Sequence, residues 1–271
     1  MIIAKNVPEL RAYLAQRRAG KRLAFVPTMG NLHAGHLKLI EVARRLADMV
    51  VVSIYVNPLQ FGANEDLDSY PRTPVEDCTA LEAQGGELLF MPGDKEMYPR
   101  GRAAQTFVEV PVLSDVLCGA SRPGHFRGVA TVVNRLFNLV QPDLALFGKK
   151  DYQQLLVIRL MVSDLGMPVE IVGVDTVRES DGLAMSSRNS YLSAAERAEA
   201  PRLQRVLQDV VGKRISPEKA IVVLADAGWK PDYVEVRRRS DLAKPQAGER
   251  ELVVLAAARI GATRLIDNLE F

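Results

Sequence analysis

The sequence predicts an α/β protein in which a doubly wound parallel sheet is followed by a smaller α+β domain. From Lys21 to about Val174, short apolar runs alternate with longer segments of helical periodicity, which is the pattern of βαβ units. Beyond about Val177 a polar stretch leads into helical and strand-like segments that predict a separate domain of ordinary size. The predicted boundary divides residues 1–176 from residues 177–271.

The first domain is predicted to contain strands that are buried on both faces of the sheet, because each is β-branched or uniformly apolar. These strands are Arg22–Val26, Val50–Val56, Glu87–Met91, Leu144–Phe147 and Glu170–Val174. The segments between them repeat apolar residues at positions i, i+3 and i+4, which predicts crossover helices. These helices are Leu37–Asp48, Pro74–Gln84, Val129–Val140 and Tyr152–Asp164.

The second domain is predicted to begin with helices and to end with strands. The spacing of Ser193 and Glu196 predicts a capping box at the start of an Ala/Glu/Arg-rich helix. A second helix is expected after Ser216, because Pro217 suits a first helical turn. The predicted strands are Tyr233–Arg237, Leu252–Ala258 and Thr263–Asn268.

Composition narrows the class of protein. With 271 residues, 48% hydrophobic and 25% charged, the chain has the make-up of a globular protein rather than of a disordered, collagenous or coiled-coil one. Its 35 Lys+Arg and 33 Asp+Glu leave a net charge of +2, so no general basic field predicts binding to nucleic acid or to an anionic membrane.

Two further observations concern the compartment. The longest apolar stretch near the start, Leu23–Val26, is far shorter than a signal-peptide core or a membrane span of about 20 residues. The cysteines, Cys78 and Cys118, form no CxxC motif and have no histidine at metal-ligand spacing. We therefore expect a cytoplasmic protein with reduced cysteines and no membrane partner.

The segment Phe25–His36 is the first candidate site, because it leaves a predicted strand and enters a predicted helix. Helix N-termini at the carboxyl ends of parallel strands offer N–H groups and a positive dipole end to phosphate. The imidazoles of His33 and His36 can donate to phosphoryl oxygens, and Gly35 lets a nucleotide approach the backbone. Two alternatives stay open here: the histidines cap the helix, or they bind a metal with other ligands.

A second polar segment, Phe147–Gln154, follows another predicted strand. The chain has no Walker-type and no G-x-G-x-x-G motif, so nucleotide binding requires a different scheme. Lys150 offers a compact positive charge to a polyphosphate, Asp151 can accept from ribose hydroxyls, and Gln154 can hydrogen-bond a polar substrate. A solvated, charged helix start is the alternative interpretation.

Three further segments are predicted to be loops with polar side chains. Met185–Asn189 combines serine hydroxyls with Arg188, which suits a loop that closes over phosphates, although an ordinary linker has the same pattern. Asn57–Gly62 presents Asn57 and Gln60 in a turn shaped by Pro and Gly, and an ordinary turn has the same pattern. Arg122–Gly128 is a Gly-rich loop with two arginines and a histidine, and either an anion-binding loop or a surface loop fits it.

Taken in order, these segments resemble the pantothenate synthetase, or pantoate–beta-alanine ligase, family over about residues 20–195. The segments that carry the resemblance are Pro27–His36, Asn57–Gly62, Tyr70–Thr73, Arg122–Gly128, Phe147–Gln154 and Asp181–Asn189. The stretch His33–His36 is similar to the HIGH signature of class I aminoacyl-tRNA synthetases and related nucleotidyltransferases. Met185–Arg188 is similar to their second, mobile signature loop. The resemblance implies a Rossmann-like domain that forms adenylates.

The resemblance also implies the reaction. Pantoate attacks the α-phosphate of ATP to give pantoyl adenylate and pyrophosphate, and beta-alanine then displaces AMP to give pantothenate. Mg²⁺ is implied as the companion of ATP, and a homodimer through the larger domain is implied as the assembly. Because the mixed anhydride supplies a good leaving group, the protein mainly has to position anions and neutralise charge. The smaller domain is expected to act as a lid that excludes water.

Roles carry over by resemblance at matching positions. The residues implied in catalysis are His33, His36, Lys150, Ser186 and Arg188, with His36 as the proton donor. Gln60 and Gln154 are implied to hold pantoate. The positions implied to bind ATP are Met29, Gly30, Asn31, Leu32, His33, Ala34, Gly35, His36, Gly148, Lys150, Asp151, Val177, Met185, Ser186, Ser187 and Arg188. At Lys149 the family often has Glu, which changes the local charge but leaves these assignments intact.

Two other functions compete with this interpretation. A nucleotidyltransferase of the same superfamily that acts on a phosphorylated substrate shares the His-x-Gly-His core, but it keeps the nucleotide in its product. An RNA-binding module is supported only by the basic run Arg237–Arg239. Because Glu235 and Asp241 lie beside that run, a solvated face is the preferred interpretation, and no nucleic-acid partner is expected.

Overall fold

The computed structural model of the protein describes residues 1–63 and 65–271. The chain divides into two compact units. The N-terminal unit consists of Met1–Lys149 and Val157–Val174, and the C-terminal unit consists of Lys150–Leu156 and Asp175–Phe271. This division groups Lys150–Leu156 with the C-terminal unit, whereas the sequence-based boundary puts them in the first domain. The binding roles given to the two domains stay predictions.

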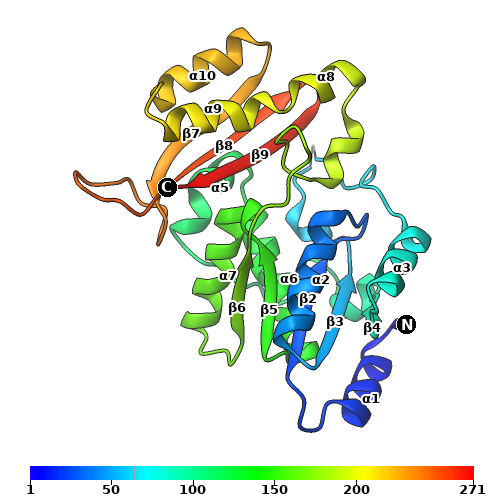
Figure 1. The fold of residues 1–271 in the computed structure, drawn as a ribbon. Coiled ribbons are helices and arrows are strands. Elements are labelled where there is room, and N and C mark those ends of the chain that lie inside the picture. Colours follow the sequence, from blue (N-terminus) through cyan, green and yellow to red (C-terminus); the bar gives the residue numbers. More distant parts are fainter. Residues whose placement is uncertain (64) are drawn as a thin grey trace. The chain divides into compact units, whose positions relative to one another are not determined.

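A six-stranded parallel sheet forms the centre of the N-terminal unit, and its strand order is β1-β4-β3-β2-β5-β6 (Figure 1). The strands are β1 (Ile2–Ala4), β2 (Leu23–Thr28), β3 (Met49–Ile54), β4 (Leu88–Phe90), β5 (Leu144–Gly148) and β6 (Glu170–Val174). This sheet and the separate small sheet of the C-terminal unit confirm the predicted fold class.

The helices of this part of the chain cover both faces of the sheet. Side chains alternate along a strand. Ala24 and Val26 of β2 share a buried cluster with Ile40 of α2, while Phe25 between them meets Phe137 of α6 with ring centroids 6.3 Å apart. The helices are α1 (Val7–Arg17), α2 (Ala34–Leu46), α3 (Pro74–Ala83), α4 (Asp94–Met97), α5 (Cys118–Ser121), α6 (His125–Val140) and α7 (Tyr152–Asp164), with 3-10 turns η1 (Pro58–Gln60), η2 (Leu113–Asp115) and η3 (Lys149–Asp151).

The sequence interpretation missed the first two elements. Strand β1 has only three residues, of which Ala4 alone is buried, so it offers no periodicity to detect. Helix α1 buries only Leu10 and Leu14, and its clearest signal is the cap, because Asn6 Oδ1 accepts from the Glu9 N–H at 2.9 Å. Both elements lie before Lys21, where the alternating pattern begins.

Helix α6 begins earlier than predicted. The sequence predicted a helix from Val129 and a loop over Arg122–Gly128, but the helix starts at His125 directly after Gly124, whose φ is +80°. His125–Gly128 therefore form the first turn of α6 rather than part of a loop. The glycine supplies a backbone conformation that other residues rarely adopt, and the chain enters the helix from there.

The C-terminal unit is a three-stranded antiparallel sheet with helices packed on it. The predicted capping box is present, since the Ser193 N–H donates to Glu196 Oε2 at 2.8 Å and the Glu196 N–H donates to Ser193 Oγ at 3.3 Å. The predicted helix breaks at Pro201, which lacks an N–H. The elements are η4 (Ser187–Tyr191), α8 (Ala194–Glu199), α9 (Arg202–Val211), α10 (Pro217–Asp226), β7 (Lys230–Arg238), β8 (Leu252–Ile260) and β9 (Thr263–Glu270).

One core cluster holds the C-terminal unit together. Leu207 of α9 is completely buried, and it shares the cluster with Val254 and Ala256 of β8 and with Trp229. In the part of the chain that the structure describes, no helix is long and apolar enough to cross a bilayer.

We expect Leu207→Ala to lower the free energy of unfolding by about 2–5 kcal/mol, because truncation leaves a cavity in a packed core. Urea unfolding can be followed through Trp229, the single tryptophan of the chain, which lies in this cluster. Val222→Ala is the control, since Val222 of α10 is 44% exposed. Equal effects of the two substitutions would contradict the assignment of Leu207 to the core.

Candidate functional site

The topology of the N-terminal unit has a switch point between β2 and β5. From β2 the chain continues to β3 and β4 on one side, whereas β5 and β6 lie on the other side of β2. Ligands of open parallel sheets bind beyond the carboxyl ends of the strands at such a point. The predicted ATP-binding segment Met29–His36 follows β2, and Gly148 is the last residue of β5.

A buried carboxylate shapes the loop after β2. Asp77 of α3, which is 2% exposed, accepts the Asn31 N–H at 2.9 Å and the Leu32 N–H at 2.7 Å. Gly30 has a φ of +81°, and a Cβ there would lie 3.0 Å from Asp77 Oδ2. The loop therefore needs both the glycine and the carboxylate.

Asp77 is not one of the site residues that were predicted from the sequence. It looks like an ordinary acidic residue in the first turn of a helix, together with Glu76. Its role depends on a contact between segments that are far apart in the chain, which one sequence does not reveal.

His33 and His36 both cap helix α2. His33 Nδ1 accepts the Gly35 N–H at 3.1 Å, and His36 Nδ1 accepts the His33 N–H at 3.3 Å. The ring centroids are 4.1 Å apart. Because Nδ1 is an acceptor in each ring, a neutral imidazole carries its proton on Nε2. The capping alternative is thus confirmed, and it is compatible with phosphate binding because it fixes each ring with Nε2–H as a donor.

The structure brings Gln60 to this loop. The Gln60 amide donates from Nε2 to Met29 Sδ at 3.0 Å, and its Oε1 accepts from Asn57 Nδ2 at 3.0 Å. Asn57 is 1% exposed, and its Oδ1 accepts from the Tyr98 hydroxyl at 2.6 Å. Two segments that the sequence treated separately, the one after β2 and the one after β3, therefore meet through a side-chain network.

Helix α6 packs against the backbone of η1 without room for a side chain. A Cβ on Gly128 would lie 2.2 Å from the Leu59 carbonyl oxygen and 2.7 Å from the Gln60 nitrogen. The Gly128 carbonyl in turn accepts from Asn57 Nδ2 at 3.1 Å. Gly128 is required because the backbones of α6 and η1 approach closely, and this approach fixes the position of the Gln60 backbone.

Side chains at the start of α6 hold the Gln60 carbonyl. His125 Nδ1 lies 2.8 Å from the Gln60 oxygen, so that nitrogen carries a proton, and Arg122 Nη2 donates to the same oxygen at 3.3 Å. Arg122 also pairs with Glu65 at 2.5 Å. Burial of Glu65 works against ionisation, but the Arg122 guanidinium outweighs it and lowers the pKa of Glu65. The Arg122–Gly128 segment thus supports the Gln60 loop from inside the unit.

The other predicted site residues belong to the C-terminal unit, namely Lys150, Asp151, Gln154, Val177 and Met185–Arg188. Lys150 Nζ donates to the Met185 carbonyl at 3.0 Å, and the Met185 N–H donates to the Val177 carbonyl at 3.0 Å. Ser186 caps η4, since its Oγ accepts the Arg188 N–H at 3.2 Å. Lys150 and the Met185–Arg188 loop are therefore in direct contact.

Burial and neighbouring charged groups both affect the pKa of Lys150. Burial lowers the pKa of Lys150 from its ordinary value, while the carboxylates of Asp151 and Asp267 oppose this effect. Among the residues that the structure describes, no group of three or more His, Cys, Asp or Glu could hold a metal ion.

We expect Asp77→Ala to lower the free energy of unfolding by about 1–3 kcal/mol, because two partly buried N–H groups lose their buried acceptor. Denaturant unfolding measures this loss. Glu76→Ala, at an exposed neighbouring position of the same helix, is the matched control. If both variants unfold at the same denaturant concentration, Asp77 does not hold the loop.

Comparisons with known proteins identify the family of the chain. A model of the pantoate-beta-alanine ligase family matches residues 2–270. The chain is 59% identical to a pantothenate synthetase of Shewanella loihica, covering 100% of this chain and 99% of that protein. It is 61% identical to a pantothenate synthetase of Shewanella amazonensis, covering 98% of this chain and 97% of that protein.

Two solved structures are similar over the whole chain. The crystal structure of pantothenate synthetase from Thermus thermophilus has a TM-score of 0.92 and 49% identity, covering 100% of this chain and 99% of that one. A pantoate-beta-alanine ligase from Francisella tularensis, complexed with beta-gamma ATP and beta-alanine, has a TM-score of 0.88 and 33% identity, covering 100% and 97%. The chain therefore belongs to the pantoate-beta-alanine ligase family.

Proposed function

We propose that this chain catalyses the ATP-dependent condensation of (R)-pantoate with beta-alanine to pantothenate, through a pantoyl adenylate. The observation that carries the proposal is the match of the family model from residue 2 to residue 270. The Francisella relative was crystallised with beta-gamma ATP and beta-alanine, which correspond to two of the three substrates.

In the first step a pantoate carboxylate oxygen bonds to the α-phosphorus of ATP, and the bond to the bridging oxygen breaks to release pyrophosphate. We assign Met29–His36 and Gly148 to the ATP site. The start of α2 presents its positive dipole end together with the Nε2–H groups of His33 and His36, and these groups suit phosphoryl oxygens. His36 is the proposed proton donor.

We assign Gln60 and Gln154 to pantoate. Amide side chains can hydrogen-bond its hydroxyl and carboxylate oxygens without burying a further charge. The Gln60 Nε2 donates to Met29 Sδ at 3.0 Å, and a thioether is a weak acceptor. Replacing that acceptor by a substrate oxygen gains a stronger hydrogen bond, so Gln60 is suited to receive pantoate.

We assign the phosphate charges to Lys150, Ser186 and Arg188, and the ribose to Asp151. Val177, Met185 and Ser187 complete the nucleotide site. In the second step the beta-alanine nitrogen bonds to the pantoyl carbonyl carbon, the bond to AMP breaks, and the nitrogen loses a proton. The C-terminal unit is proposed to act as the lid that excludes water from the adenylate.

Mg²⁺ is proposed to enter as part of MgATP. An ion carried by phosphates and waters needs few protein ligands. We place the reaction in the cytoplasm, where ATP is made. Within the described residues, Cys78 and Cys118 form no disulfide, as is usual in a reducing compartment.

We propose a homodimer formed through the N-terminal unit. Phe107 and Val112, which lie between α4 and α6, are 39% and 77% exposed. Val112 also has a φ of +66°, a strained conformation for a β-branched residue. Contact with a second copy offers these apolar side chains a partner of the same chemistry.

Sedimentation analysis is therefore expected to give a dimer, and Val112→Glu is expected to shift it toward monomer because a charge enters an apolar interface. Val75→Glu is the control, since Val75 of α3 is 74% exposed on the same unit. A wild-type monomer, or a dimer that Val112→Glu leaves intact, would count against this interface.

The reaction itself is tested by measuring pyrophosphate and AMP from MgATP with pantoate, with and without beta-alanine. Pyrophosphate is expected from pantoate alone, and AMP only when beta-alanine is added. His36→Ala and Lys150→Ala are each expected to lower the rate by about 10²–10³, as does the loss of one preorganised charge-stabilising group.

Lys244→Ala is the control for Lys150→Ala, because Lys244 is an exposed lysine of the same unit. Pyrophosphate release without any amine-dependent AMP would instead identify a nucleotidyltransferase. No turnover with pantoate would refute the substrate assignment.

A further inference from the structure

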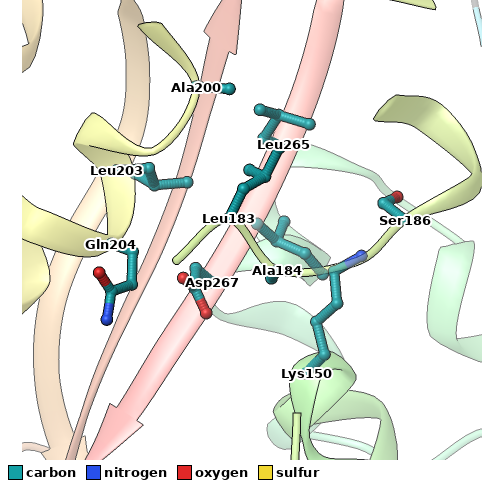
Figure 2. A pocket seen from close by; sticks show the side chains of 10 residues that line it. Lys150, Leu183, Ala184, Ser186, Ala200, Leu203, Gln204, Leu265 and Asp267 are labelled. Atoms are coloured by element: carbon teal, nitrogen blue, oxygen red, sulfur yellow. The ribbon is translucent and has the colours of Figure 1, made fainter. Parts of the chain in front are cut away.

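The last strand of the chain carries buried polar residues that the proposed mechanism does not use. Asp267 and Asn268 of β9 are 4% and 6% exposed. Figure 2 shows Asp267 beside a small pocket that Lys150 and Ser186 also line. The pocket measures about 10 Å³, which is too small for a ligand. Asp267 and Asn268 instead contact other protein groups, namely the Arg178 side chain and the Lys150 carbonyl.

Asn268 holds the backbone of the predicted phosphate-binding lysine. Its Nδ2 donates to the Lys150 carbonyl oxygen at 2.8 Å. Its own N–H donates to Asp267 Oδ1 at 2.8 Å, so the two neighbours are connected. A hydrogen bond to the peptide of Lys150 fixes where the side chain starts, and thus where its ammonium group can reach.

Asp267 holds the other half of the same site through Arg178. The two side chains form a bidentate pair, with Nη1 to Oδ2 at 2.7 Å and Nη2 to Oδ1 at 2.9 Å. Arg178 Nη1 also donates to the Gly182 carbonyl at 3.0 Å. Bidentate arginine pairs are strong and specific in geometry, so this pair fixes the turn around Gly182.

That turn leads directly into the Met185–Arg188 loop. Arg178 and Ala184 form an antiparallel bridge, and the Met185 N–H donates to the Val177 carbonyl at 3.0 Å. The Met185 carbonyl then accepts from Lys150 Nζ at 3.0 Å. One strand therefore anchors both the lysine and the loop that contacts it.

We propose that Asp267 and Asn268 are positioning residues for the nucleotide site, with Asn268 setting the backbone of Lys150 and Asp267 setting the Met185–Arg188 loop through Arg178. The inference rests on the proposed function, because that function assigns Lys150 and the loop to ATP. Asp267 has a second effect, since its carboxylate counteracts the lowering of the Lys150 pKa by burial.

The test measures the Kd for MgATP by titration calorimetry, together with the KM values of the reaction. Asn268→Ala is expected to weaken MgATP binding about fivefold to tenfold, as the loss of a hydrogen bond does. The KM for beta-alanine is expected to stay unchanged. Asp267→Asn is expected to weaken MgATP binding in the same way, and Asp267→Glu to restore most of it.

Asp232→Asn is the matched control. Asp232 Oδ2 accepts from Arg264 Nε at 2.7 Å, so the substitution removes another arginine–aspartate pair from the same sheet. If Asn268→Ala and Asp267→Asn affect MgATP no more than Asp232→Asn does, the proposal is overturned. Should Asp267→Asn fail to fold, Asn268→Ala decides alone.

The pH dependence gives a readout that a purely structural role does not move. The charged groups that act on Lys150 are Asp151 and Asp267, which raise its pKa, and Arg178 and Arg188, which lower it. Removing the Asp267 charge is expected to move the loss of MgATP affinity at high pH toward lower pH. An unmoved pH profile would refute this second effect.

The calorimetric arm keeps this proposal separate from the proposed reaction. If the wild-type protein binds MgATP but makes no pantothenate, the reaction is refuted, while the Asn268→Ala effect on Kd still decides the positioning role. If the wild-type protein does not bind MgATP at all, both fail together.

Discussion

The position of β2 between β3 and β5 is the constraint on which the N-terminal unit depends. Parallel pairing on both sides makes β2 the strand from which the sheet is built outward in two directions. The carboxyl end of β2 therefore faces a switch point, and the segment that follows it must turn sharply to begin α2. The positive φ at Gly30 and the carboxylate of Asp77 make that turn feasible. Because this turn ends at His33, directly before α2, the side chains of His33 and His36 can cap the helix.

Buried polar side chains hold three of the predicted site segments, and two of these side chains come from distant parts of the chain. Asp77 holds the loop before His33, Asn57 holds the Gln60 amide, and Asn268 holds the Lys150 carbonyl. A buried polar group is costly unless it is hydrogen-bonded, so these contacts select one loop conformation over others. Ligand-binding groups that are fixed before the ligand arrives lose less conformational entropy on binding. The buried polar contacts thus fix the backbone around a few side-chain donors whose hydrogen bonds a ligand can replace. The Gln60 amide, which donates to Met29 Sδ, is one of these donors.

The sequence predicted the elements that have a strong period and missed those that have none. Strands β2, β3 and β5 consist mainly of apolar residues, and the Ser193 capping box has a local signature, so both could be found. Strand β1 is too short to show a period, and the first turn of α6 lies between glycines that are typical of a loop. The candidate residues came from strand-end motifs and from a resemblance. Their supports could not be predicted, because Asp77 and Asn268 act through contacts between segments far apart in the chain, and a lone Asp or Asn carries no pattern.

The predicted site residues divide by charge as well as by unit. In the N-terminal unit they are neutral donors, namely the imidazoles of His33 and His36, the Gln60 amide and the start of α2, whereas Lys150 and Arg188 belong to the C-terminal unit. Neutral donors orient a polyphosphate, but they do not cancel its charge. In the proposed reaction, the positively charged side chains assigned to the phosphates, Lys150 and Arg188, therefore both come from the C-terminal unit. Burial disfavours a charged Lys150, and the carboxylates of Asp151 and Asp267 counteract this. The strand that positions the lysine thus also helps to keep it charged, which couples the geometry of the site to its electrostatics.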